Sequence, residues 1–114
     1  SLLTGTDGVT LPFEPSWSRA VYHIFAIRSN DRSGLMNHLK MAGIGTGVHY
    51  PIPLHLQAAY RKLNYKEGDF PTAERLSIEI VSLPMFPHLG KEQQKRVAEE
   101  VLAFVSQAKS ALPF

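Results

Sequence analysis

The stretch that decides the fold is Ala20-Val21-Tyr22-His23-Ile24-Phe25-Ala26-Ile27, in which β-branched and aromatic side chains predominate. The polar run Arg28-Ser29-Asn30-Asp31 follows it directly. This pattern is typical of a β-strand that ends in a turn. Apolar residues stand at nearly every position, which favours a central strand covered on both faces. We therefore expect a buried strand here, with His23 as a hydrogen-bonded imidazole in the core.

Helical periodicity indicates three segments after this strand. The first, 31–43, follows an Asn-Asp pair that can cap a helix and ends at Gly43, a residue suited to the left-handed position after a helix. The second, 71–80, begins at Pro71, which fits a first helical turn. The third, 91–109, has the most regular apolar stripe, formed by Val97, Val101, Phe104, Val105 and Ala108.

The remaining segments are less regular. Residues 44–50 contain two glycines and precede a proline, and residues 81–86 contain Pro84, so both are expected as edge or irregular strands. Residues 54–62 fit a short helix. Residues 1–19 are rich in Gly, Thr, Pro and Ser and are expected as an extended lead-in.

The order strand, helix, strand, helix, strand, helix predicts an α/β (α+β) fold, a two-layer sandwich whose small mixed or antiparallel sheet carries helices mainly on one face. The chain has 114 residues, enough for one domain and not two, so residues 20–114 are expected as a single domain. The second face of such a sheet lacks cover. We therefore expect the chain to associate through that face with another domain or with a second copy of itself.

Composition argues against several classes of protein. The formal net charge is only +2 and the basic residues are scattered, which argues against nucleic-acid binding. The absence of cysteine excludes disulfides and thiolate chemistry and fits a cytoplasmic protein. The five histidines form no H-x-x-x-H pair, so no metal site is expected. No apolar stretch approaches the ~20 residues of a membrane span, and the first residues lack the features of a signal peptide.

Most of the chemistry-bearing residues fall in Gly45-Thr46-Gly47-Val48-His49-Tyr50-Pro51-Ile52-Pro53-Leu54-His55. The two glycines allow close approach of a ligand, the prolines fix the path, and His49 with Tyr50 supplies two hydrogen-bonding rings. This composition suits a binding loop, and it equally suits a stiffened crossover whose rings only pack. The glycine spacing matches neither a dinucleotide site nor a P-loop, and no nucleophile motif is present.

The stretch from Val48 to Gln57 resembles the C-terminal domain of the DegT/DnrJ/StrS family, pyridoxal-phosphate-dependent aminotransferases of nucleotide-linked keto sugars. Residues 22–28, 41–46, 68–74 and 82–87 resemble further blocks of that domain in the same order. The resemblance covers roughly residues 8–105. It implies the small domain of a fold type I aminotransferase.

This resemblance implies which part of the site the chain carries. The family's large domain holds the Schiff-base lysine and the acidic partner of the pyridinium nitrogen, and no motif here matches either, so the expected cofactor of this chain is none, with pyridoxal phosphate in the full-length parent. The family's His-Tyr pair lies near the diphosphate of the nucleotide-sugar substrate. His49 and Tyr50 are thereby implied as substrate ligands, and His55 either as a weaker candidate ligand or as a residue that only pins the loop. Ala58 stands where relatives often have proline, which puts the loop geometry in question.

Two functions follow as hypotheses. In the first, the chain is the small domain of a sugar aminotransferase, which supplies substrate contacts and subunit packing but is not competent alone. In the second, it is a stand-alone, non-catalytic oligomerisation module derived from that domain. Both predict a homo-oligomer that forms through the face normally covered by the large domain.

Overall fold

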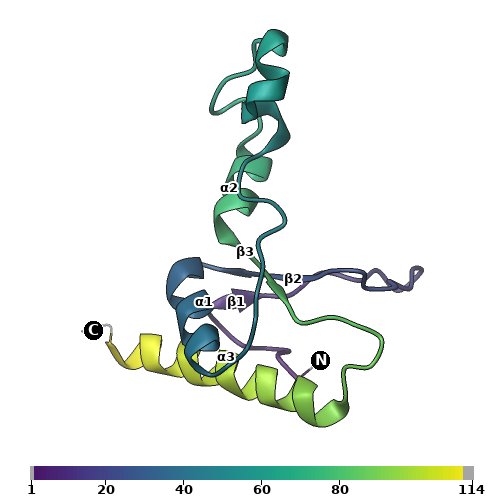
Figure 1. Ribbon diagram of the computed structural model, residues 1–114, viewed down its shortest axis with the longest axis vertical. Coiled ribbons are helices and arrows are strands. Elements are labelled where there is room, and N and C mark those ends of the chain that lie inside the picture. Colours follow the sequence, from purple (N-terminus) through teal and green to yellow (C-terminus); the bar gives the residue numbers. More distant parts are fainter. Residues whose placement is uncertain (1, 112–114) are drawn as a thin grey trace.

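The computed structural model describes residues 2–111 and is shown in Figure 1. Short strand β1 and strand β2 come first, followed by helix α1, two 3₁₀ helices, helix α2, strand β3 and the long helix α3. Their bounds are β1 Val9–Thr10, β2 Phe25–Ser29, α1 Arg32–Met41, η1 Leu54–Leu56, η2 Ala58–Leu63, α2 Pro71–Glu79, β3 Ile80–Leu83 and α3 Lys91–Ala111.

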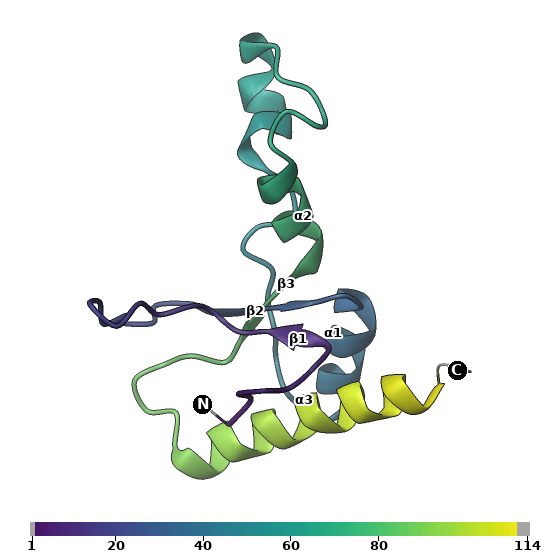
Figure 2. The ribbon, with the colours of Figure 1, turned by 180° about the vertical axis from the view of Figure 1, so that it is seen from behind.

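The three strands form an antiparallel sheet in the order β1-β2-β3. Phe25 pairs with Leu83 and Ile27 with Val81, so side chains of both strands alternate between the same two faces. Helices α1 and α3 lie along one face, as Figure 1 and Figure 2 show from opposite sides. The predicted two-layer α+β sandwich, with helices mainly on one face, is confirmed.

The core lies between this face of the sheet and the two helices. The largest side chains that are fully buried come from β2, β3, α1 and α3, namely Ile27, Val81, Leu35, Leu39 and Val101. On α3 the buried stripe includes Ala98 and Val105, whereas Ala108, which the periodicity also assigned to it, is exposed. No helix within residues 2–111 is both long and apolar enough to cross a membrane.

The strand predicted at residues 20–27 is shifted, and this prediction is wrong in its first half. Strand β2 begins only at Phe25. Before it, Glu14 accepts hydrogen bonds from the Ala20 N–H at 2.7 Å and from the Tyr22 hydroxyl at 2.8 Å, and Tyr22 has a φ of 46°, which interrupts an extended chain. Val21 is consequently 95% exposed.

His23 is also exposed, so the prediction of a core imidazole is wrong. At its other end β2 extends through Arg28 and Ser29, which composition assigned to a turn. Arg28 Nε lies 2.8 Å from Glu79 Oε2 on α2, and Ser29 is buried opposite Val9. The ion pair and the pairing with β1 give these polar residues partners within the sheet layer.

Two segments expected as irregular contribute to the sheet and core. In the segment 1–19, expected as a lead-in, Val9–Thr10 forms β1 and Leu3 is a core side chain. The edge strand expected at residues 44–50 reduces to one bridge between Gly47 and Ser82. The predicted helices agree well with α1, α2 and α3, and Asp31 caps α1 by accepting a hydrogen bond from Gly34 N–H.

Residues 51–79, which we call the arm, rise away from the sandwich at the top of Figure 1. The arm holds both 3₁₀ helices and α2. The radius of gyration is 16.0 Å, against roughly 13 Å for a compact chain of this length. Every residue from 61 to 70 is exposed. The arm is therefore supported by few contacts with the core and depends on its own hydrogen bonds.

Glu74 provides the main internal tie of the arm. Its carboxylate accepts hydrogen bonds from the backbone N–H groups of Gly68, at 2.9 Å, and of Phe70, at 3.2 Å. His55 Nε2 lies 2.8 Å from Glu74 Oε1, and its ring packs edge-on against Phe70 with 4.8 Å between centroids. One carboxylate thus connects η1, the loop after η2 and α2.

The bond from Gly68 N–H is the main cause that lowers the pKa of Glu74 below its ordinary value of 4.5. A carboxyl whose pKa is lower in the folded state stabilises that state above its ordinary pKa. This stabilisation is lost as the pH falls through the folded-state value. The tie is therefore complete at neutral pH and weakens only in acid, below pH 4.5.

Replacing Leu39 with alanine should lower the free energy of unfolding by about 2–5 kcal/mol, because a fully buried leucine leaves a cavity. Met41 is on the same helix but is 81% exposed, so Met41→Ala should change stability by about 0.5 kcal/mol or less. Urea denaturation of wild type and both variants measures these changes in the free energy of unfolding. Equal losses in the two would place the core elsewhere.

Replacing Glu74 with alanine should loosen the arm and leave the sandwich folded, because the carboxylate holds only arm residues. Amide hydrogen exchange should speed up at Gly68 and Phe70 and stay slow at Val81. Glu67→Ala is the matched control, since Glu67 is exposed and makes no hydrogen bond within the described chain. In wild type, the protection factors of the same two amides, which correct for the intrinsic effect of pH on exchange, should fall only below pH 4.5. Unchanged exchange in Glu74→Ala would refute this role.

Candidate functional site

The predicted binding loop is fixed to the outer edge of β3. Gly47 N–H donates to the Ser82 carbonyl at 3.1 Å, and Ser82 N–H donates to the Gly47 carbonyl at 2.8 Å. Because β3 has β2 on its other side, this pair of bonds extends the sheet by a single residue. The chain then turns away into the arm. The loop therefore has one rigid anchor, directly before the residues that carry its rings.

The His49 ring lies against that anchor. Its Nδ1 is 2.8 Å from Ser82 Oγ. A Cβ on Gly47 would lie 3.0 Å from His49 Cε1, so glycine at this position leaves the ring its room. His49 is exposed as a whole, and its Nε2 has no hydrogen-bond partner among the described residues. The ring is thus held on one side and open on the other.

Tyr50 lies beside His49 and faces solvent. The two rings meet edge to face with 5.4 Å between centroids, and Tyr50 is 69% exposed. A phenol and an imidazole at this spacing can both donate to the oxygens of one anionic group. The structure thus brings together two of the three residues that the sequence singled out.

His55 lies apart from this pair. Its side chain is only 7% exposed, enclosed in the arm beside Glu74 and Phe70. Within the described chain it makes no hydrogen bond or ring contact with His49 or Tyr50. Its partners, Glu74 and Phe70, both belong to the arm.

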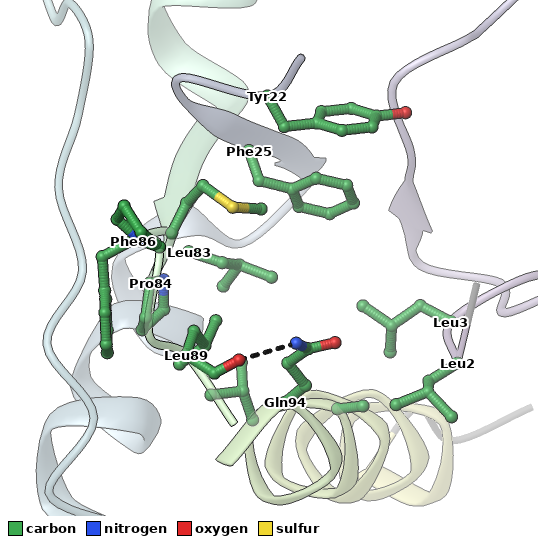
Figure 3. Close-up of a pocket in the computed structure, with 13 residues that line it drawn as sticks. Leu2, Leu3, Tyr22, Phe25, Leu83, Pro84, Phe86, Leu89 and Gln94 are labelled. Carbon is green, nitrogen blue, oxygen red and sulfur yellow. Dashed lines mark hydrogen bonds between the residues drawn. The ribbon is translucent and has the colours of Figure 1, made fainter. Parts of the chain in front are cut away.

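An apolar hollow of about 500 Å³, missed by the sequence reasoning, lies between the N-terminal residues, the connection after β3 and the start of α3 (Figure 3). Its few polar groups include the amide of Gln94, which donates to the Leu89 carbonyl at 3.0 Å. The only signal in the sequence was two apolar pairs, Leu2-Leu3 in the expected lead-in and Met85-Phe86 at the end of the segment expected as an irregular strand. The wall is formed by Leu2, Leu3, Tyr22, Phe25, Leu83, Pro84, Met85, Phe86, Pro87, Leu89, Gln94, Val97 and Ala98.

In residues 2–111 no group of three or more His, Asp or Glu side chains is placed to hold a metal ion. All the lysines lie exposed on the surface, and three of them pair with carboxylates: Lys66 with Asp69, Lys95 with Glu99, and Lys109 with Asp7. Lys40 borders a second hollow of about 410 Å³ beside Ile44 and Thr46, and Lys40 is exposed there as well.

Comparison with known proteins found relatives that are much longer than this chain. A "pleiotropic regulatory protein" of Geobacillus stearothermophilus is 46% identical over 98 residues, which are 86% of this chain and 26% of the relative. The dTDP-3-amino-3,4,6-trideoxy-alpha-D-glucose transaminase of Streptomyces venezuelae is 39% identical, over 87% of this chain and 26% of the relative. The chain thus spans about a quarter of the length of these relatives.

Solved structures agree. DesV of S. venezuelae, crystallised with a ketimine intermediate, matches with a TM-score of 0.87 at 38% identity, over 91% of this chain and 28% of DesV. A Brucella abortus DegT DnrJ EryC1 StrS aminotransferase matches with a TM-score of 0.79 at 34% identity, over 90% of this chain and 27% of that one. The family model for DegT/DnrJ/EryC1/StrS aminotransferases matches residues 1–102. This chain therefore belongs to the DegT/DnrJ/EryC1/StrS aminotransferase family.

Proposed function

We propose that this chain is the C-terminal, small domain of a pyridoxal-phosphate-dependent aminotransferase that acts on a nucleotide-linked keto sugar. Its role is to contact the substrate and to pack against the rest of the enzyme, and it does not transfer an amino group alone. The family membership and the coverage of about a quarter of each relative support this proposal. The observation that carries it is the pair of open rings, His49 and Tyr50, on a loop anchored to the sheet.

The cofactor belongs to the remainder of the enzyme in this proposal. Pyridoxal phosphate supplies an electron sink for amino transfer and needs a lysine and an acid poised around its ring. The lysines of this chain do not fit that need, because each is solvated. Lys66, for example, is 82% exposed in its side chain and lies 3.0 Å from Asp69. In this proposal no lysine of this chain takes part in the reaction.

The substrate contact is assigned to His49 and Tyr50. The substrate class carries a diphosphate, whose oxygens accept hydrogen bonds from imidazole N–H and phenol O–H groups. The open Nε2 side of His49 and the exposed Tyr50 ring can both reach an anion placed outside β3. His55 stabilises the path of the loop through Glu74 and does not contact the substrate.

The same proposal accounts for the exposed apolar side chains. Phe13, Trp17 and Val21 are 89%, 85% and 95% exposed on the loop before β2, which extends beyond the sandwich in Figure 2. Leu54, Leu63 and other apolar side chains of the arm are also largely exposed. A monomer rarely leaves so much apolar surface in water. In the parent enzyme, the large domain or a second copy of the protein covers the loop before β2 and the arm.

A nucleoside diphosphate sugar should bind the isolated chain weakly, with a dissociation constant of about 1 mM (about −4 kcal/mol), because most contacts are missing. NMR titration with dTDP-glucose should move the signals of His49 and Tyr50. His88 is exposed and remote from the loop in sequence, and its signals serve as the internal control. Equal shifts at His88 and His49, or none at either, would contradict the assignment.

The isolated chain should self-associate, because the apolar side chains of the loop before β2 and of the arm are exposed in it. Sedimentation equilibrium should give an average mass above the 12.7 kDa of one chain, rising with concentration. The double variant Phe13→Ser, Trp17→Ser should associate less, since it removes two exposed rings without touching the core. A single monomeric species across the whole concentration range would contradict this part of the proposal.

A further inference from the structure

We propose that Ser82 is a positioning residue for His49: its buried hydroxyl donates to Nδ1, which keeps the imidazole proton on Nε2, the side that is open to an anionic ligand. The inference rests on the proposed role of His49 in substrate contact. It adds the group that determines which nitrogen of the His49 ring carries the proton.

The position of Ser82 is fixed by its backbone. Both its N–H and its carbonyl are bonded to Gly47, and its neighbours in β3, Val81 and Leu83, are buried in the core. Ser82 itself is only 6% exposed. The strand therefore holds the Ser82 hydroxyl in place, and its Oγ lies 2.8 Å from Nδ1 of His49.

The direction of this bond follows from the donors and acceptors present. A serine hydroxyl and an imidazole nitrogen can each donate or accept. If Nδ1 carried the proton and donated to Oγ, the Ser82 hydroxyl would need another acceptor. His49 Nδ1 is its only partner within the described chain, and no buried side-chain oxygen or nitrogen there lacks a partner. A buried donor without an acceptor costs about 1–3 kcal/mol, so the hydroxyl donates and Nδ1 accepts.

The consequence lies on the other side of the ring. A neutral imidazole that accepts at Nδ1 carries its proton on Nε2. The Nε2–H group has no partner among residues 2–111 and belongs to an exposed residue. It is thus a donor ready for an oxygen of a phosphate or a sugar. The opposite tautomer would present a lone pair, which repels an anion.

The test is the tautomer of His49 in the 15N-labelled chain, read from long-range 1H–15N correlations at about pH 8.5, where an ordinary imidazole is neutral. Wild type should show a protonated Nε2 and an unprotonated Nδ1. In Ser82→Ala both tautomers should be populated, and the two nitrogen frequencies should move toward each other. A proton on Nδ1 in wild type would overturn the inference without any variant.

Matched variants separate positioning from folding. Ser77 is equally buried, but its hydroxyl donates to the Glu74 carbonyl, so Ser77→Ala should leave the His49 signals unchanged. Ser82→Thr keeps the hydroxyl and should keep the Nε2–H tautomer. The Gly47 amide should retain its shift in any variant that is folded. A folded Ser82→Ala chain with wild-type His49 frequencies would overturn the inference.

Titration with dTDP-glucose separates this inference from the proposed function. Ser82→Ala should bind about fivefold more weakly than wild type and Ser77→Ala equally well, as expected for one hydrogen bond. If the tautomer is as stated but wild type does not respond to the nucleotide sugar, Ser82 still positions the ring and the proposed function fails. If wild type binds and Ser82→Ala binds equally well, the positioning role fails and the proposed function stands.

Discussion

Strand β3 supports both the core and the candidate site, and the rest of the structure depends on this double contact. Val81 and Leu83 are buried in the core, while Ser82 between them bonds to Gly47 and His49. The alternation of a strand makes this possible, because neighbouring side chains point to opposite faces. Hydrogen bonds thus connect the His49 ring and its loop to a strand that also forms part of the core.

Much of the fold was predictable, because it depends on local patterns. The periodicity of α3, the capping Asp31 of α1 and Pro71 in the first turn of α2 are local features of the sequence, and these helices were therefore predicted correctly. The strand predicted at residues 20–27 was misplaced because the residue at which β2 begins depends on Glu14. This side chain accepts hydrogen bonds from Ala20 and Tyr22 across a loop. A run of apolar residues does not reveal such a bond. Val21, which is 95% exposed, belongs to the loop before β2 rather than to a buried strand.

The candidate site was predictable only in part. The sequence singled out His49, Tyr50 and His55 together, since all lie in one stretch of the chain. Their different surroundings come from Ser82 and Glu74, which follow 33 and 19 residues later. Only the fold shows that one histidine faces solvent from the sheet edge and another is enclosed in the arm. The apolar hollow was missed for the same reason, because its walls come from distant segments.

We propose that this chain contacts a nucleotide-sugar substrate and does not transform that substrate alone. This proposal is tested most directly by incubating the purified chain with pyridoxal phosphate, an amino-acid donor and a nucleotide-linked keto sugar, followed by borohydride reduction and mass spectrometry of protein and sugar. We predict that this chain forms no amino sugar and has no cofactor fixed at a single lysine. A full-length relative should form the amino sugar and carry the cofactor on one lysine. Amino sugar formed by the purified chain alone would contradict the account.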